Sequence, residues 1–209
     1  MRSSIAPGFR RLAVSAGLIL CACALVDGAS AQPAQSSREA PKQSDPRSVS
    51  TVVEQANRLI KEGKTGDART LLDGALKQAP RDPQLRFLFG VVAADQGNTR
   101  EAIDVFEQLS ADFPELPEPY NNLAVMHAAA GDLDSARAAL ENAVRALPGY
   151  ALAHENLGDL HLRLAARSYE RALTADKRSD TARTKLSLAR DLIARIAPKP
   201  AGAPAPRNN

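Results

Sequence analysis

The sequence predicts an all-α protein, a solenoid of stacked helical hairpins with three regular units of 34 residues, an irregular fourth unit and a C-terminal capping helix. Two observations carry this prediction. Aromatic residues make up only 4% of the 209 residues and Trp is absent, which disfavours β-sandwiches, whereas the many Ala, Leu and Arg residues suit helices. In addition, several residue types recur at a spacing of 34, as repeated structural units require.

Residues 1–31 have the pattern of a secretory signal peptide. Three arginines come before an apolar run at residues 12–26, and this run is too short to span a bilayer comfortably. Ala29 and Ala31 then supply small residues at both positions that a signal peptidase reads, so cleavage after Ala31 is predicted. The mature protein is accordingly expected to be periplasmic or secreted.

The same segment supports a second interpretation, which the sequence leaves open. Leu20-Cys21-Ala22-Cys23 resembles a bacterial lipobox, in which Cys23 would be acylated and would become the new N-terminus. The chain would then be a membrane-anchored lipoprotein, and membrane association is expected only in that lipidated form.

Composition excludes several classes of function. Both cysteines lie before Ala31, so cleavage there leaves a mature chain without thiol catalysis, disulfides or cysteine metal sites. The formal charge of +3 includes three Arg and one Asp from residues 1–31, so the chain that remains after cleavage is nearly neutral. Electrostatic binding to the phosphates of nucleic acid is therefore not predicted. Residues 32–48 are predicted to be a flexible linker and residues 198–209 a disordered tail, because both lack apolar periodicity.

Five series of residues carry the 34-residue period. Two of them consist of small residues, one of glycines, one of large apolar residues and one of prolines that close each unit. They are Ala56, Gly90, Ala124 and Gly158; Gly63, Gly97 and Gly131; Ala68, Ala102 and Ala136; Leu72, Phe106 and Leu140; and Pro80, Pro114 and Pro148. The folded array is predicted at residues 49–197, with units at 49–82, 83–116, 117–150 and, irregularly, 151–197.

Each unit is predicted to form a helical hairpin. In the first unit, helices are expected from about Val49 to Glu62 and from about Thr65 to Ala79, with Gly63 ending the first in a left-handed conformation. The small residues let the two helix axes approach closely and pack ridge into groove. One hairpin cannot bury its outer face alone, so the hairpins are expected to stack.

The fourth unit lacks five residues that would contain its inter-helix turn. From Gly158 the matching string Ala165-x-x-x-Tyr169-x-x-Ala172 begins after seven residues, where the other units have twelve. The preferred prediction is one long helix over about residues 151–176, with a sharp turn near 163–166 as the alternative. Ser179 and Asp180 are good N-caps for a final amphipathic helix, which is expected to pair with the long helix and cap the array.

This pattern of a small residue, an Ala, a large apolar residue and a closing Pro resembles the tetratricopeptide repeat family. The resemblance covers residues 49–150 as three units of 34. It implies a concave groove, lined by the first helices, that binds extended peptides or partner helices. It also places Asn122 and Asn156 where the family often presents an Asn amide to a peptide backbone.

Carried over residue by residue, the resemblance gives ten candidates for the groove. They are Asn57, Lys61, Phe87, Val91, Asn121, Asn122, Val125, Glu155, Asn156 and Asp159. The Lys/Asn set that grips C-terminal carboxylates in chaperone cofactors is not reproduced, so binding of a C-terminal carboxylate is not predicted.

No catalytic residues, no cofactor, no metal site and no small-molecule substrate are predicted. His127, His154 and His161 occupy slots that hold aromatic residues in the family, and no carboxylate joins them at ligand spacing. Gly63-Lys-Thr-Gly66 lacks the leading Gly and the strand context of a phosphate loop, so it is interpreted as a helix turn.

The functional hypothesis is a non-enzymatic scaffold of the bacterial cell envelope that binds a protein or peptide partner in its groove. The alternative is a lipid-anchored assembly factor, similar to the pilotins, acylated at Cys23. Self-association through the long helix is also left open.

Overall fold

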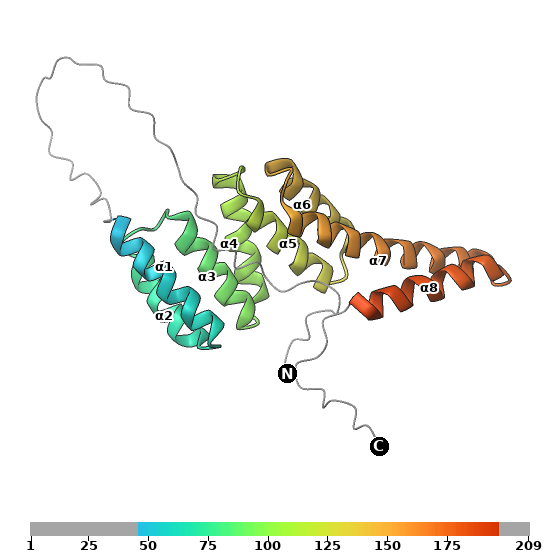
Figure 1. Ribbon diagram of the computed structural model, residues 1–209, viewed down its shortest axis with the longest axis horizontal. Helices are drawn as coiled ribbons and strands as arrows, with labels where there is room; N and C mark the ends of the chain where they lie inside the picture. Colours follow the sequence, from blue (N-terminus) through green and yellow to red (C-terminus); the bar gives the residue numbers. More distant parts are fainter. Residues whose placement is uncertain (1–45, 197–209) are drawn as a thin grey trace, which may run out of the picture.

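The computed structural model describes residues 46–196, which form eight α-helices and contain no strand (Figure 1). The helices are α1 (Pro46–Lys61), α2 (Thr65–Leu76), α3 (Pro83–Asp95), α4 (Thr99–Asp112), α5 (Pro117–Ala129), α6 (Leu133–Ala146), α7 (Ala151–Ala175) and α8 (Asp180–Ile196). This confirms the predicted all-α solenoid of helical hairpins. The predicted signal peptide, Cys23, the tail at 198–209 and most of the linker at 32–48 lie outside the described residues.

Two predicted helix boundaries need correction. The first helix begins at Pro46, before the expected Val49, so the last residues of the predicted linker belong to α1. The second helix ends at Leu76 and not at Ala79. There the chain tightens into a turn in which the Gln78 N–H donates to the Ala75 carbonyl three residues earlier, one of the ways in which the last carbonyls of a helix are satisfied.

The turn inside each regular unit depends on a glycine with positive φ. Gly63, Gly97 and Gly131 have φ of 73°, 82° and 83°, a backbone conformation that residues with a Cβ rarely adopt. In the first unit the Gly63 N–H donates to the Ile60 carbonyl and the Lys64 N–H donates to the Leu59 carbonyl. The other two turns repeat both bonds, so the predicted left-handed glycine stop is confirmed in all three units.

The hairpins close where a small residue of the first helix meets a large one of the second. Ala56 and Leu72 in the first unit, and Ala124 and Leu140 in the third, are all 0% exposed. The second unit has Gly90 opposite Phe106, whose ring would lie only 2.7 Å from a Cβ at position 90. The larger ring is therefore matched by the smaller residue, and close packing of the helix axes is kept in all three hairpins.

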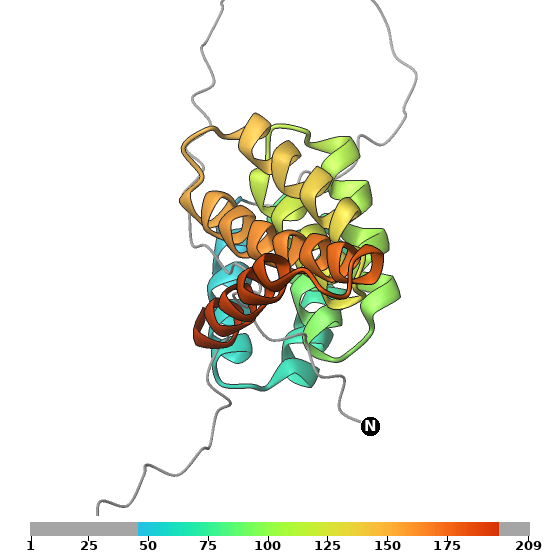
Figure 2. The same ribbon diagram turned by 90° about the vertical axis from the view of Figure 1, so that its right-hand side faces the viewer.

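The fourth unit lacks the turn that divides each regular unit into two helices, because Ala151–Ala175 is one uninterrupted helix. The helix α7 instead forms a longer hairpin with α8. The N-terminal part of α7 packs on α6 and α5, and α8 packs against α7 at the end of the array (Figures 1 and 2). The seam joins Ala166, Tyr169 and Leu173 of α7 to Leu186, Ala189 and Ile193 of α8. The continuous helix was the preferred prediction, and α8 covers the C-terminal part of α7, not the end face of the array.

An ion pair with stacking ties the first unit to the second. The Arg69 guanidinium donates to both carboxylate oxygens of Glu101 at 2.7 and 2.8 Å, and its Cζ lies 4.1 Å from the centroid of the Phe89 ring. Arg69 is also 3.4 Å from a carboxylate oxygen of Asp73 on its own helix. A bidentate, stacked guanidinium of this kind fixes the relative position of α2, α3 and α4.

Acidification should remove the contribution of this ion pair. Hydrogen bonding to Arg69 lowers the pKa of Glu101 below its ordinary value of 4.5. A lowered folded-state pKa gives stability that is present above the unfolded pKa and lost as the pH falls through the folded pKa. We expect the difference in urea midpoint between the wild type and Glu101→Gln to be largest at neutral pH and to shrink below about pH 4.5. Glu107→Gln, an exposed change on the same helix, is the control, and a difference that stays constant with pH would contradict the prediction.

Candidate partner-binding surface

The candidate surface is formed by the first helix of each unit, namely α1, α3, α5 and the N-terminal half of α7. These helices are neighbours in pairs, since α1 contacts α3 and α5 contacts α7. Among the described helices, α5 packs against α4, α6 and α7, whereas the main contacts of α1 are with α2 and α3. Side chains in the middle of the row are therefore buried, and those at its two ends are accessible.

Five of the ten predicted groove residues are buried and cannot contact a partner in this structure. They are Val91, Asn121, Asn122, Val125 and Asn156, with exposed fractions of 0 or 1%. Their predicted role as lining residues is corrected: the 34-residue register identifies their position on the first helix, but adjacent units pack closely enough to cover that position in the middle of the array.

The Asn residues form part of the packing between units. Asn156 on α7 donates through Nδ2 to Oδ1 of Asn121 on α5 at 2.8 Å, and both side chains are 0% exposed. A buried hydrogen bond between two amides adds orientation to an interface that would otherwise be apolar. In this structure these amides join one unit to the next.

The accessible residues of the surface lie on α1 and α7, at the two ends of the row, and in the N-terminal part of α3 between them. Lys61 is exposed and Asn57 half-buried on α1, Phe87 is half-buried on α3, and Glu155 is exposed and Asp159 half-buried on α7. Positions three residues before Asn57 and Phe87 share their helix faces, so Glu54 and Gln84, both exposed, belong to the same surface. Neither position was predicted from the sequence, although the spacing of three residues along each helix indicates both of them.

Three side chains near the starts of α3, α5 and α7 make polar contacts that hold these helix starts in place. Arg86 pairs with Asp112 at 2.6 Å, the Tyr120 hydroxyl donates to the Ser110 carbonyl at 3.1 Å, and His154 Nε2 donates to the Pro148 carbonyl at 2.8 Å. Each contact reaches the end of a second helix or the loop that follows it. This is a structural use of His154, and no group of three metal-ligating side chains occurs among residues 46–196.

Tyr150 is a half-buried phenol at the N-cap of α7. Burial, followed by the charge of Glu118, raises the pKa of Tyr150 to about 12. The phenol therefore stays protonated and neutral at physiological pH, so it does not serve as a base there.

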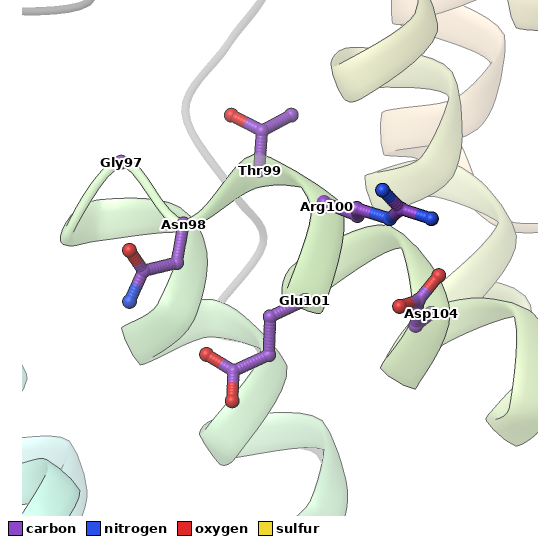
Figure 3. Close-up of a pocket in the computed structure, with 6 residues that line it drawn as sticks. All are labelled: Gly97, Asn98, Thr99, Arg100, Glu101 and Asp104. Carbon is purple, nitrogen blue, oxygen red and sulfur yellow. The ribbon is translucent and has the colours of Figure 1, made fainter.

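A pocket at the turn between α3 and α4 has no convergent polar groups. Its lining residues are Gly97, Asn98, Thr99, Arg100, Glu101 and Asp104 (Figure 3). Figure 3 shows the Glu101 side chain pointing away from those of Arg100 and Asp104, and Glu101 is already bound by Arg69. Ligand sites need several polar groups aimed at one point, so this pocket offers no chemical site.

The eight described helices include no segment with the length and apolar character of a membrane span.

Comparison with known proteins identifies the repeats. The family profile described as "Tetratricopeptide repeat" matches residues 53–117, 87–151 and 121–178. A TPR repeat-containing thioredoxin of Arabidopsis thaliana, TTL4, is 39% identical over 75 residues, which cover 36% of this chain and 11% of that protein. The chain thus matches only a small part of that curated relative.

Two similar solved structures hold a bound peptide or protein segment. The first TPR of Spaghetti (RPAP3) bound to the HSP90 peptide SRMEEVD has a TM-score of 0.52 and 18% identity, covering 58% of this chain and 96% of that one. PcrH, a protein of Pseudomonas aeruginosa, in complex with the chaperone binding region of PopB has a TM-score of 0.50 and 17% identity, covering 55% and 96%. At these identities the likeness shows the fold alone. With three profile matches that together span residues 53–178, and with three Gly-stopped hairpins in the same register, the chain belongs to the tetratricopeptide repeat family.

Proposed function

We propose that this protein is a non-enzymatic interaction scaffold that holds a peptide or protein partner against the exposed ends of its first-helix surface. The observation that carries the proposal is the distribution of exposure along that surface. Lys61 and Glu54 at the α1 end and Glu155 at the α7 end are open to solvent, and Phe87 lies half-exposed between them. Related folds bind a peptide or a protein segment, as the two complexes above do, which supports this use of the surface.

The two ends of the surface favour an extended partner. At the α1 end the exposed Lys61 and Arg58 outnumber Glu54 by one charge, whereas Glu155 and Asp159 give the α7 end negative groups. A partner segment with acidic residues at one end and basic residues at the other would be oriented by this arrangement, since complementary charges fix register and direction more than they raise affinity.

Site-specific photo-crosslinking tests the proposal. A photoreactive amino acid at position 61 or 155 is expected to give a partner crosslink in cells, whereas the same group at the exposed positions 77, directly after α2, and 107 on α4 is not. The charge exchange Lys61→Glu with Glu155→Lys keeps the net charge and should reduce capture of that partner about tenfold, or about 1.4 kcal/mol. The matched control is Lys77→Glu with Glu107→Lys. Equal crosslinking from all four positions would contradict groove binding.

The proposed location is the bacterial cell envelope, with export directed by residues 1–31. The pattern of arginines, apolar run and small residues at Ala29 and Ala31 supports it. The second candidate is a lipid-anchored assembly factor acylated at Cys23, which the Leu20-Cys21-Ala22-Cys23 box favours. Mass spectrometry of the mature N-terminus separates the two, because cleavage after Ala31 gives an unmodified N-terminus at Gln32 and lipoprotein processing gives a diacylated or triacylated Cys23.

A further inference from the structure

In each regular unit, one face of the second helix packs against the first helix of the same unit. The C-terminal half of α7 has the residues of such a face, but the turn that would bring a first helix against it is missing. In the third unit the equivalent face consists of Ala136, Leu140 and Ala143, all 0% exposed against α5. In α7 the same string is Ala165, Tyr169 and Ala172, of which Ala172 is exposed and the other two are half-buried. Because α7 continues straight through the position of the turn, it cannot fold back to cover its own face.

The helix α8 covers only one edge of this face. It packs on Ala166, Tyr169 and Leu173, so Tyr169 borders both the seam and the open side, whereas Ala165 and Ala172 lie outside this apolar cluster. On the other side of the hairpin, Arg190 donates to Glu170 at 2.8 Å. At 100° per residue, Ala165, Tyr169 and Ala172 lie on the side of α7 that is turned away from Glu170. Lys185 of α8 lies on that side too, since its Nζ is 5.9 Å from the centroid of the Tyr169 ring.

An apolar stripe of α8 extends this side of the hairpin. Leu188, Leu192 and Ile196 are 59%, 48% and 38% exposed, and they follow Lys185 at helical spacing. The part of the chain that the structure describes exposes four large apolar side chains, and three of them are in this stripe. Clustered exposure of this kind marks an interaction site, whereas the fourth, Leu147, stands alone.

The hairpin formed by the C-terminal part of α7 and by α8, residues 160–196, has a net positive charge, whereas the rest of the array has a net negative charge. Residues 160–196 contain nine Lys and Arg against four Asp and Glu, whereas residues 49–159 contain ten against seventeen. Lys185 and Arg195 flank the apolar stripe, Arg195 being three residues after Leu192 and seven after Leu188. Two such hairpins from two copies of the chain would repel each other, and a partner with acidic flanks would be attracted.

We propose that this hairpin face, made of Ala165, Tyr169, Ala172, Leu188, Leu192 and Ile196, binds one amphipathic helix of a partner protein whose flanks carry Asp and Glu. The small residues of α7 let the incoming helix approach closely, as the small residues of the regular units do for their own helices. The leucines of α8 supply the apolar contact, and Lys185 and Arg195 pair with the acidic flanks. The hairpin face is separate from the first-helix surface, so either proposal can fail without the other.

A designed peptide tests the hairpin face on the full mature chain. The probe is a fluorescently labelled amphipathic helix of about five turns with a Leu stripe and Glu flanks, and its counterpart has Lys in place of every Glu. We expect saturable binding of the Glu peptide only, weakened at least tenfold by Leu188→Gln with Leu192→Gln and unchanged by Leu147→Gln. All three positions are exposed, so folding is kept, and circular dichroism checks it. Lys185→Glu with Arg195→Glu should reverse the preference toward the Lys peptide.

Four outcomes would overturn the proposal. The first is no saturable binding of the Glu peptide, and the second is equal binding of both peptides. The third is sedimentation of the wild type as a concentration-dependent dimer that Leu188→Gln with Leu192→Gln abolishes, which would assign the face to a second copy. The fourth is recruitment to vesicles of anionic phospholipid, lost in the same variant, with no binding of the Glu peptide, which would assign it to a membrane surface.

Discussion

Gly90→Ala should destabilise the array by about 1–3 kcal/mol, although the same change inside an ordinary helix would be stabilising. A Cβ at position 90 would lie 2.7 and 2.9 Å from two carbons of the Phe106 ring and 3.1 Å from a methyl of Val105. Phe106 is 0% exposed, so its ring cannot swing into solvent to make room. The measurement is the urea midpoint of the variant against that of the wild type, with the two m-values compared.

Two further variants make this prediction specific. Gly90→Ala with Phe106→Leu recreates the Ala/Leu pair found at Ala56 and Leu72, so the double variant should recover much of the stability that Gly90→Ala loses. Gly158 has the same place in the 34-residue register, but a Cβ there meets nothing within 4 Å. Gly158→Ala should therefore stabilise the protein by about 0.5–1 kcal/mol. Strictly additive losses in the double variant would show that the Gly90–Phe106 contact is not the cause.

Asn156→Leu should also destabilise the protein, by about 1–3 kcal/mol, through a hydrogen bond and not through lost apolar contact. The change removes the donor of the 2.8 Å bond to Asn121 Oδ1 and leaves that carbonyl buried beside an apolar side chain. Thermal unfolding followed by circular dichroism measures the effect. The midpoint should fall by roughly 2–4 °C for each kcal/mol in a domain of this size.

The partner variant Asn121→Leu with Asn156→Leu removes both groups of this hydrogen bond. Replacing both polar partners by apolar groups of similar shape is close to neutral, so the double variant should be more stable than Asn156→Leu alone. A double variant that is less stable than the single one would mean that the amides act through other contacts. Because these amides are 0% exposed, a loss of partner binding in such variants would result from distorted packing of the first-helix surface and not from a lost contact with the partner. The exposed residues Lys61 and Glu155 are therefore the better probes of binding.

The repeat architecture was predictable from the sequence because local chemistry repeats with it. Gly63, Gly97 and Gly131 each need a left-handed backbone, and each one ends a helix at the expected place. The small and the large apolar series were recognised by their constant spacing, whereas the pairs Ala56/Leu72 and Ala124/Leu140 became evident only in the structure. The absence of the inter-helix turn after Gly158 likewise predicted the continuous helix Ala151–Ala175.

The binding surface was predicted less well, because exposure depends on several units at once. Asn57 and Val125 occupy equivalent positions in the 34-residue register, yet Asn57 is half-buried at the end of the array and Val125 is 1% exposed in its middle. The register places both side chains on the same face of a first helix, but only the number of neighbouring helices decides whether solvent reaches that face.

The sequence by itself determined the helices, their glycine stops and the family, because these depend on residues close in the chain or at a constant spacing. Only the tertiary structure decided that Asn121 and Asn156 bind each other and that Ala172 of α7 and Leu188 of α8 are left exposed. Burial and shared faces arise from how separate helices stack, and the free energy of that stacking comes from contacts between residues that no local pattern brings together.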